Sequence, residues 1–326
     1  MTKEKIYEEE YVNINGANHY LLHYKTKQEN PVLLFLHGGP GQSESMMAYI
    51  VEDYAKRNYN IVYYDQRGAG KTFLKNKKLR ANTQILKDDL LEIVLYLKKM
   101  YGKDKIGILG HSWGSALGSM FVLEHPEHVL CYIGCGQVVD VMENERVGYQ
   151  KLREAIEQAG NDKDHKALEK IGTYPLEGEF NMNYMKKMGQ IRNLQGKYNL
   201  AIKADKSFVR MIMKSPIIGL RDLYPFMVGI LYNKQVTSEL MAFDLRKFGV
   251  KYDVPMYYVL GENDQQTPVE MGVQYYEEIE APNKKLYIIK NAGHAPMVDN
   301  TVDYREAICE IVREILAKEA NCYNKI

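Results

Sequence analysis

Cysteine is scarce in this chain of 326 residues, which contains four. So few cysteines exclude a disulfide-stabilised scaffold at this length. Cys131 and Cys135 fall in one apolar run, where a strand would hold their Cα atoms about 13 Å apart, too far for a disulfide. We therefore expect free buried thiols at both positions. No group of His, Cys and Asp residues has the spacing of metal ligands, so we predict no metal and no cofactor.

An excess of charge of either sign is also missing. The 43 basic and 42 acidic residues leave a net charge of +1, which gives no electrostatic reason to expect a nucleic acid or a membrane as partner. No apolar run approaches the roughly 20 residues that span a bilayer, and residues 1–27 contain no apolar core of signal-peptide length. We therefore expect a cytoplasmic protein, whose oligomeric state stays open.

Short apolar runs of strand length recur along the chain. Two of them flank Asn15-Gly16, which predicts an opening β-hairpin. Further strands are predicted near residues 31–36, 61–64, 105–109, 129–135, 256–260 and 285–289, and helices at 46–59, 83–101, from 268 onward and at 302–317. About eight strands alternating with helices predict an α/β fold, in which a mostly parallel, doubly wound sheet has helices on both faces and its active site at the carboxyl ends of the strands.

Residues 138–250 break this alternation. The stretch is rich in Met, Tyr, Lys and Glu and lacks the apolar runs of interior strands. We interpret it as a helical cap inserted between a first part of the core, residues 1–137, and a second part, residues 251–326. Within it, Ser215 to Tyr232 combines two prolines with many apolar residues. Packing against the core is favoured there over contact with a membrane or lipid.

The pentapeptide GHSWG at residues 110–114 follows an apolar run and leads into a stretch of small residues. A strand, a sharp turn and a helix form the context in which G-x-S-x-G is a nucleophile elbow. Ser112 would then lie exposed at a helix N-terminus, where the helix dipole favours negative charge. The alternative is an ordinary turn that happens to contain a serine.

A serine hydroxyl needs a base that takes its proton, and the base needs a third group that orients it. Asp264 and His294 each follow a predicted strand by a few residues, in the chain order Ser, Asp, His that this fold uses. We predict that Ser112, Asp264 and His294 form a catalytic triad. Glu262 and Asp303 are rival candidates for the acid.

A glycine-rich loop, HGGPG at residues 37–41, follows the strand predicted at 31–36. Its unhindered backbone N–H groups suit an oxyanion hole, and we predict Gly39 and Trp113 as the two donors. A second loop, GAGKT at residues 68–72, imitates the end of a phosphate-binding loop. The first glycine of that motif would have to stand at Asp65, whose carboxylate would repel phosphate, and residues 73–80 show no clear helical pattern, so we do not expect nucleotide binding.

Together these motifs resemble the α/β-hydrolase superfamily over nearly the whole chain, and within it the proline iminopeptidase branch. The marks are HGGPG at residues 37–41, DQRGAG at 65–70, GHSWG at 110–114, and the GEND and AGH loops at 261–264 and 292–294. The resemblance implies the triad named above, oxyanion donors at Gly39 and Trp113, and a helical cap; with the strands counted above, we expect an α/β-hydrolase fold with a mostly parallel eight-stranded sheet.

The resemblance also implies that acidic cap residues hold the free amine of the substrate. The cap offers Glu143, Glu145, Glu177, Glu179 and Glu239. Glu143 and Glu145 are the first candidates, because they follow the strand that ends near Gly136, where the chain leaves the sheet.

The sequence therefore predicts a cofactor-independent serine hydrolase that forms an acyl-enzyme at Ser112. We expect a proline iminopeptidase-like aminopeptidase acting on short peptides. The alternatives are a carboxylesterase or amidase acting on small acyl substrates, and a non-catalytic member of the fold that binds a small molecule or partner.

Overall fold

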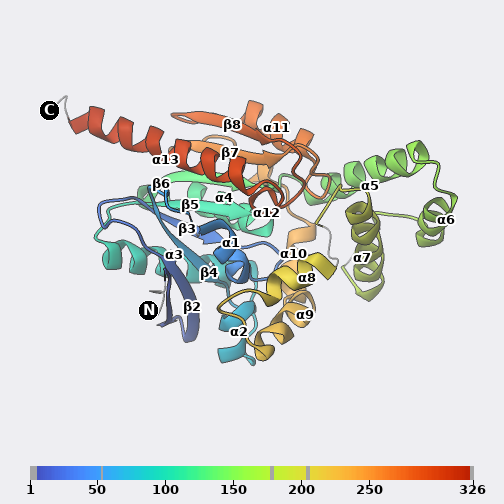
Figure 1. Ribbon diagram of the computed structural model, residues 1–326, viewed down its shortest axis with the longest axis horizontal. Coiled ribbons are helices and arrows are strands. Elements are labelled where there is room, and N and C mark those ends of the chain that lie inside the picture. The colour runs from blue at the N-terminus through green and yellow to red at the C-terminus, as the bar shows by residue number, and fades with distance from the viewer. Residues whose placement is uncertain (1–5, 53, 177–179, 203–205, 324–326) are drawn as a thin grey trace.

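A single eight-stranded sheet lies at the centre of the computed structural model, which describes residues 6–52, 54–176, 180–202 and 206–323 (Figure 1). The strand order is β1-β2-β4-β3-β5-β6-β7-β8. The first two strands form the predicted hairpin, β2 pairs antiparallel with β4, and all later pairs are parallel. The strands are β1 (Glu8–Ile14), β2 (Ala17–Tyr24), β3 (Val32–Leu36), β4 (Asn60–Asp65), β5 (Ile106–His111), β6 (Val129–Cys135), β7 (Met256–Gly261) and β8 (Lys284–Ile289).

Both faces of the sheet are covered by helices, as the sequence predicts. Along β3, Leu34 and Leu36 pack into one apolar core while Leu33 and Phe35 pack into another, because successive side chains of a strand point to opposite faces. Helices α3 (Thr83–Tyr101), α4 (Trp113–Glu124) and α11 (Val269–Glu278) cover the first face. Helices α1 (Ala48–Glu52) and α13 (Thr301–Tyr323) cover the second, and the short α12 (Pro296–Asp299) precedes α13. Cys131 and Cys135 are both buried, as expected.

Two local predictions are wrong. The helix expected at residues 46–59 ends at Glu52, after a 3₁₀ turn (Ser45–Met47) and α1. Arg57 ends it, because its guanidinium donates to the Glu52 backbone carbonyl at 2.7 Å and to the Glu52 carboxylate at 3.1 Å. Conversely, a short helix, α2 (Gly70–Lys75), reaches into the stretch where no helix was expected. The Asp65 carboxylate accepts from the Lys71 backbone N–H at 2.8 Å and so stabilises the N-terminus of α2.

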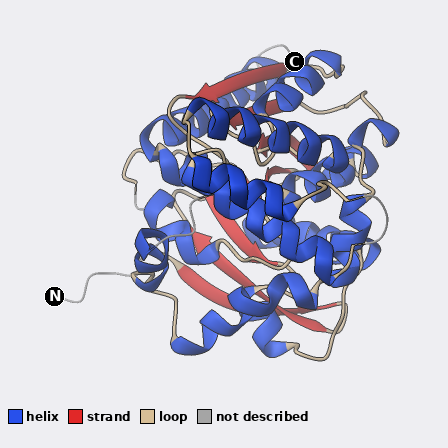
Figure 2. Ribbon diagram, turned by 90° about the vertical axis from the view of Figure 1, so that its right-hand side faces the viewer, coloured by secondary structure: helices blue, strands red, loops and turns tan. Residues whose placement is uncertain are grey.

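The stretch predicted as a cap is helical, and its described residues add no strand to the sheet. Its helices gather at one end of the molecule (Figures 1 and 2). Helices α5, α6 and α7 share an apolar cluster of their own, whereas α8 packs against the 3₁₀ turn before α1. The cap helices are α5 (Val141–Gln158), α6 (Asp162–Ile171), α7 (Met182–Lys197), α8 (Lys206–Met213), α9 (Leu223–Tyr232) and α10 (Lys234–Met241). The cap also contains the short 3₁₀ turns η3 (Leu220–Asp222) and η4 (Leu245–Lys247), whereas η2 (Pro126–His128) precedes β6 in the core.

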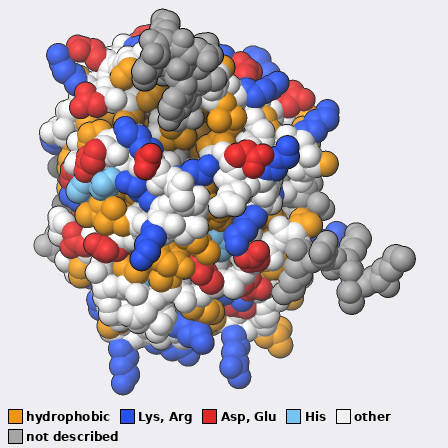
Figure 3. Space-filling view, turned by 90° about the vertical axis from the view of Figure 1, so that its left-hand side faces the viewer, with side chains coloured by type: hydrophobic (Ala, Val, Ile, Leu, Met, Phe, Trp, Pro, Cys, Tyr) orange, Lys and Arg blue, Asp and Glu red, His pale blue; other side chains and the backbone are white. Residues whose placement is uncertain are grey.

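The surface away from the cap carries interspersed basic and acidic side chains (Figure 3). This mixture matches the balanced composition of the chain. None of the helices in the described part of the chain is both long and apolar enough to cross a bilayer.

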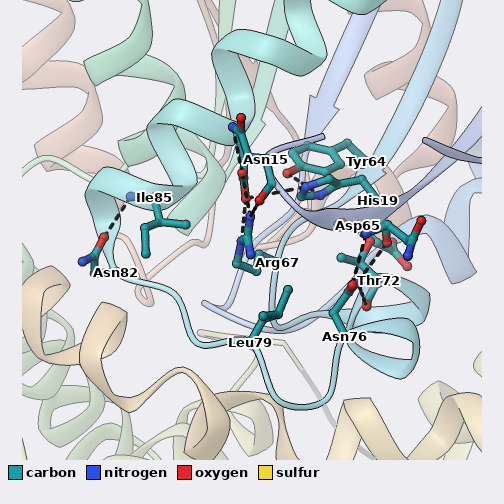
Figure 4. Close-up of polar contacts among 12 residues, drawn as sticks. Asn15, His19, Tyr64, Asp65, Arg67, Thr72, Asn76, Leu79, Asn82 and Ile85 are labelled. Carbon is teal, nitrogen blue, oxygen red and sulfur yellow. Dashed lines mark hydrogen bonds and ion pairs between the residues drawn. The ribbon is translucent and has the colours of Figure 1, made fainter. Parts of the chain in front are cut away.

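A buried ion pair ties the opening hairpin to the sheet and to α3 (Figure 4). Arg67, in the loop after β4, donates to both carboxylate oxygens of Asp89 in α3, at 2.8 and 2.9 Å. The same guanidinium donates to the Asn15 backbone carbonyl at 3.2 Å, and the Asn15 side chain donates to Asp89 at 3.2 Å. The loop carrying DQRGAG therefore fixes three elements relative to one another.

Candidate active site

The turn between β5 and α4 has the geometry of a nucleophile elbow. Ser112 sits in it with φ 52° and ψ −121°, a left-handed conformation that non-glycine residues rarely adopt. Its neighbours leave no room for side chains. A Cβ on Gly114 would lie 2.0 Å from the Leu36 carbonyl oxygen, and one on Gly110 would lie 2.3 Å from the Gly114 carbonyl oxygen. The two glycines let strand and helix approach closely enough to hold this turn.

His294 and Asp264 meet on two loops at the same edge of the sheet. His294 Nδ1 lies 2.9 Å from Asp264 Oδ2, and both side chains are buried. The Thr267 hydroxyl donates to Asp264 Oδ2 at 2.8 Å, while the backbone N–H groups of Gln266 and Thr267 donate to Oδ1 at 2.9 and 3.0 Å. Burial raises the pKa of Asp264, but His294 and Thr267 outweigh it, so the pKa lies below its ordinary value. The carboxylate is therefore ionised beside the imidazole.

The second ring nitrogen of His294 remains available. His294 Nε2 is buried and has no hydrogen-bond partner among the described residues. His294 and Ser112 both line one cavity of about 220 Å³ beneath the cap. The structure thus brings the three predicted triad residues to one site, with Asp264 on one nitrogen of His294 and the other nitrogen unoccupied.

The two rival acids lie elsewhere. Glu262 accepts from Lys290 Nζ at 2.7 Å and from the Asn291 backbone N–H at 3.1 Å, partly exposed to solvent. Asp303 lies in the first turn of α13 and accepts from the Asn300 side chain at 2.7 Å. Among the described contacts neither carboxylate touches His294.

The two predicted oxyanion donors, Gly39 and Trp113, both line the cavity. Trp113 is the first residue of α4, where the helix leaves backbone N–H groups without an internal partner. The neighbouring Gly38 N–H is already engaged, since it donates to Glu44 Oε1 at 3.0 Å. The Gly39 N–H makes no hydrogen bond within the described part of the chain.

The loop that carries these glycines is held by Gln66, from the DQRGAG segment. Gln66 Oε1 accepts from the Trp113 indole at 2.8 Å, and Gln66 Nε2 donates to the His37 carbonyl at 3.1 Å. The His37 ring bonds to two backbone groups, the Gly38 carbonyl at 2.7 Å and the Gln66 N–H at 3.1 Å. His37 therefore supports the loop and does not line the cavity.

Sequence reasoning missed a buried ion pair beside the elbow. His111 Nδ1 lies 2.7 Å from Glu44 Oε1, and His111 Nε2 lies 2.7 Å from the His294 carbonyl oxygen. Because both ring nitrogens face acceptors, His111 carries two protons. Burial lowers the pKa of His111, but the Glu44 carboxylate outweighs it, so the pKa is raised. The pair connects the HGGPG loop, the elbow and the His294 loop. A glutamate three residues after HGGPG is the one sequence signal for it.

The rest of the cavity wall is mainly apolar, and most of it comes from the cap. Asn144, Glu145 and Arg192 add polar groups to it. The apolar lining comprises Met46, Met47, Val138, Val141, Met188, Ile202, Phe208, Ile212, Phe226, Ile230, Leu240 and Met241.

The acidic cap residues differ in where they lie. Glu145 lines the cavity, but its carboxylate is bonded to the Arg192 guanidinium and the Tyr174 hydroxyl. Glu143 is exposed, pairs with Arg146 and does not line the cavity. Glu239 accepts from the Thr83 backbone N–H at 2.7 Å, outside the cavity. Glu177 and Glu179 lie outside the described residues.

Comparison with known proteins agrees with this fold. Residues 31–161 match the family model described as alpha/beta hydrolase fold. A probable aminopeptidase of Bacillus subtilis is 26% identical over 291 residues, covering 88% of this chain and 91% of that protein. The chain has the α/β-hydrolase fold and is related to the proline iminopeptidases. A proline iminopeptidase of Saccharolobus solfataricus is also 26% identical, over 94% of this chain and 93% of its own length.

Solved structures support the fold assignment. The crystal structure of a proline iminopeptidase from Mycobacterium smegmatis superposes with a TM-score of 0.67 at 16% identity, covering 95% of this chain and all of that chain. A proline iminopeptidase-related protein from Thermus thermophilus gives a TM-score of 0.65 at 20% identity, covering 95% and 98% of the two chains. At these identities the likeness concerns the fold alone.

Proposed function

We propose that this α/β hydrolase is a serine hydrolase whose triad is Ser112, His294 and Asp264. His294 Nε2 takes the proton of the Ser112 hydroxyl as Oγ attacks the substrate carbonyl. The backbone N–H groups of Gly39 and Trp113 bind the resulting oxyanion. His294 then gives its proton to the leaving group, and a water molecule hydrolyses the acyl-enzyme by the same steps.

One observation carries this proposal: the buried Asp264 carboxylate lies 2.9 Å from Nδ1 of His294, which lines the same cavity as Ser112. Asp264 holds the imidazole in one tautomer and stabilises the imidazolium that forms when Ser112 loses its proton. A protein that only binds a ligand has no need of this arrangement, which disfavours the non-catalytic alternative.

For the substrate, we propose an N-terminal residue of a short peptide, as in a proline iminopeptidase. Relatives named as aminopeptidase or proline iminopeptidase align with most of this chain, cap included, which supports this choice. The small volume of the cavity, about 220 Å³, also suits one small residue.

A second candidate, a carboxylesterase or amidase acting on an apolar acyl group, is favoured by the charges of the cavity. Its glutamates are already bonded, Glu44 to His111 and Glu145 to Arg192. Both carboxylates therefore already have a cationic partner, and Glu44 Oε2 is the one carboxylate oxygen of the described cavity wall without a hydrogen bond. The methionines and phenylalanines of the wall suit an acyl chain.

Initial rates on matched substrates separate these candidates. We would compare a prolyl arylamide with a free amine, its N-acetylated form, and p-nitrophenyl esters of increasing acyl length. An aminopeptidase cleaves the free amine and rejects the acetylated form. Equal rates on both arylamides, with faster cleavage of the esters, would leave the esterase or amidase. No turnover of any of them and no labelling by a fluorophosphonate would contradict the serine hydrolase itself.

A further inference from the structure

Helices α8 and α9 of the cap have apolar side chains on two opposite faces. Their inner faces line the cavity beside Ser112, through Phe208 and Ile212 of α8 and Phe226 and Ile230 of α9. The rings of Phe208 and Phe226 lie 6.4 Å apart, so the inner faces meet. A helix at the surface of a globular protein normally has one apolar face, which is buried. The outer faces therefore need a separate explanation.

The outer face of α9 and of the 3₁₀ turn before it is a continuous apolar stripe. Leu220, Tyr224, Met227 and Leu231 are spaced by four, three and four residues, which places them on one side of a helix. They are 83%, 53%, 78% and 51% exposed, respectively. The expectation that residues 215–232 pack against the core is therefore right for the inner face and wrong for the outer one.

The outer face of α8 adds exposed apolar and basic side chains. Val209 and Met213 are exposed, and so are the basic residues one position further along, Arg210 and Lys214. From the first residue of α8 to the first residue of α10 the sequence contains five basic residues and a single acidic one, Asp222. Asp222 in turn lies 3.7 Å from Lys71 Nζ. The excess of basic residues in this segment contrasts with the net charge of +1 for the whole chain and with the mixed face in Figure 3.

We propose that the outer surface of α8 and α9, here called the cap outer face, docks onto an anionic lipid surface. Exposed apolar side chains flanked by Lys and Arg are what an interfacial helix uses, since the apolar groups enter the acyl boundary and the cations pair with lipid phosphates. A second copy of the chain fits less well, because a twofold contact would set this basic surface against itself. The expectation of no membrane partner rested on the overall net charge, which averages out this local excess.

Docking in this way relates the lipid surface to the cavity. The same two helices that touch the lipid with their outer faces form part of the cavity wall with Phe208 and Phe226. The cavity wall is then held at the interface, where amphiphilic substrates are concentrated. The docking itself needs no chemistry at Ser112, so it stands independently of the proposed hydrolase activity.

Co-sedimentation of the full chain with vesicles tests this proposal. We expect binding to vesicles of phosphatidylcholine mixed with phosphatidylglycerol, weakened by salt, and little binding to pure phosphatidylcholine. Leu220→Ser with Met227→Ser should weaken partition by at least about tenfold, through loss of the apolar contact. Arg210→Gln with Lys214→Gln should weaken it by a similar factor of about ten, through loss of two cations. Val302→Ser is the matched control, because Val302 is 62% exposed on α13, outside the cap outer face.

Circular dichroism of each variant checks that the fold is kept, and gel filtration reports self-association. Absence of binding to the anionic vesicles would overturn the proposal. So would binding that the cap variants and the Val302 control weaken equally. If the chain self-associates but does not bind vesicles, and the cap variants abolish this self-association, the cap outer face binds a second copy of the chain. That result would also overturn the proposal of lipid docking. Fluorophosphonate labelling of the same samples tests the hydrolase separately, so a failure of one proposal is not mistaken for a failure of the other.

Discussion

His111 Nδ1 lies 2.7 Å from Glu44 Oε1, and both side chains are buried beside the nucleophile elbow. The pKa of His111 is raised above its ordinary value of 6.5, because the Glu44 carboxylate outweighs burial. The pKa of Glu44 is lowered below 4.5, since His111 outweighs the burial of the carboxylate. Both shifts favour the charged forms of the pair, which joins three loops that surround the site.

This pair predicts a pH-dependent stability. The contribution of His111 is fully present below pH 6.5 and is lost as the pH rises through its raised pKa. The contribution of Glu44 is present above pH 4.5 and is lost as the pH falls through its lowered pKa. Glu44→Gln should therefore lower the free energy of unfolding by about 3 kcal/mol between these limits, and by less at pH 9.

Urea unfolding of wild type and Glu44→Gln at pH 6 and pH 9 measures this effect. Glu143→Gln is the control, since Glu143 and Arg146 form an exposed pair on one helix and should contribute little at either pH. An equal loss of stability at both pH values would mean that His111 is not protonated by its contact with Glu44.

The nucleophile is tested by Ser112→Ala. The smaller side chain fits the elbow but cannot form an acyl-enzyme, so kcat should fall on the order of 10⁵-fold or more while the melting temperature stays close to that of wild type. Labelling by a fluorophosphonate should vanish in parallel. A variant that retained wild-type rates would remove Ser112 from the mechanism.

The acid is tested by Asp264→Asn. His294 would lose the partner that fixes its tautomer and stabilises its imidazolium form, so kcat should fall about 10⁴-fold. Glu262→Gln, two residues before Asp264 on the same loop but paired with Lys290, serves as the matched control and should retain activity. A large loss in Glu262→Gln with near-normal rates in Asp264→Asn would transfer the role to Glu262.

The sheet and its elbow were predictable because their signals are local. Asn15-Gly16 predicted the hairpin, and a strand followed by GHSWG predicted the turn at Ser112. The Glu44–His111 and Glu145–Arg192 contacts were not predictable, because they join residues 67 and 47 positions apart that share no motif. The early end of α1 had a different cause, since the contact of Arg57 with Glu52 spans only five residues but is not recorded in the hydrophobic pattern that predicted the helix. The roles of the triad residues remain predictions that kinetics must test.

Two glycines on helices provide a matched test of the packing at the elbow. A Cβ on Gly114 would meet the Leu36 carbonyl oxygen at 2.0 Å, so Gly114→Ala forces α4 away from β3 and should cost about 3 kcal/mol or more. Gly189, within α7, has nothing within 4 Å of its Cβ position. Gly189→Ala should therefore stabilise the protein by about 0.5–1 kcal/mol through helix propensity. Thermal unfolding of both variants checks the opposite signs, and a stable Gly114→Ala would contradict the close approach.

The last prediction concerns whether Glu145 holds a substrate ammonium group. Its carboxylate is bonded to Arg192 and to the Tyr174 hydroxyl, so we expect it to neutralise Arg192 and leave the ammonium without a partner there. Glu145→Gln would then leave an unpaired cation in the cavity wall, which repels a cationic substrate. Two p-nitrophenyl esters that differ only by the ammonium group, alanyl and propionyl, measure this repulsion as a ratio of kcat/KM.

Glu145→Gln should lower the ratio of alanyl to propionyl hydrolysis by about tenfold or more, because like charges now face each other. The double variant Glu145→Gln/Arg192→Gln removes that cation as well and should restore the ratio to near the wild-type value. If Glu145 instead binds the ammonium directly, the double variant stays as impaired as Glu145→Gln, since the binding carboxylate is missing from both. Glu143→Gln, outside the cavity, should leave the ratio unchanged in either case. The double variant therefore decides between a carboxylate that recognises the substrate and one that only balances Arg192.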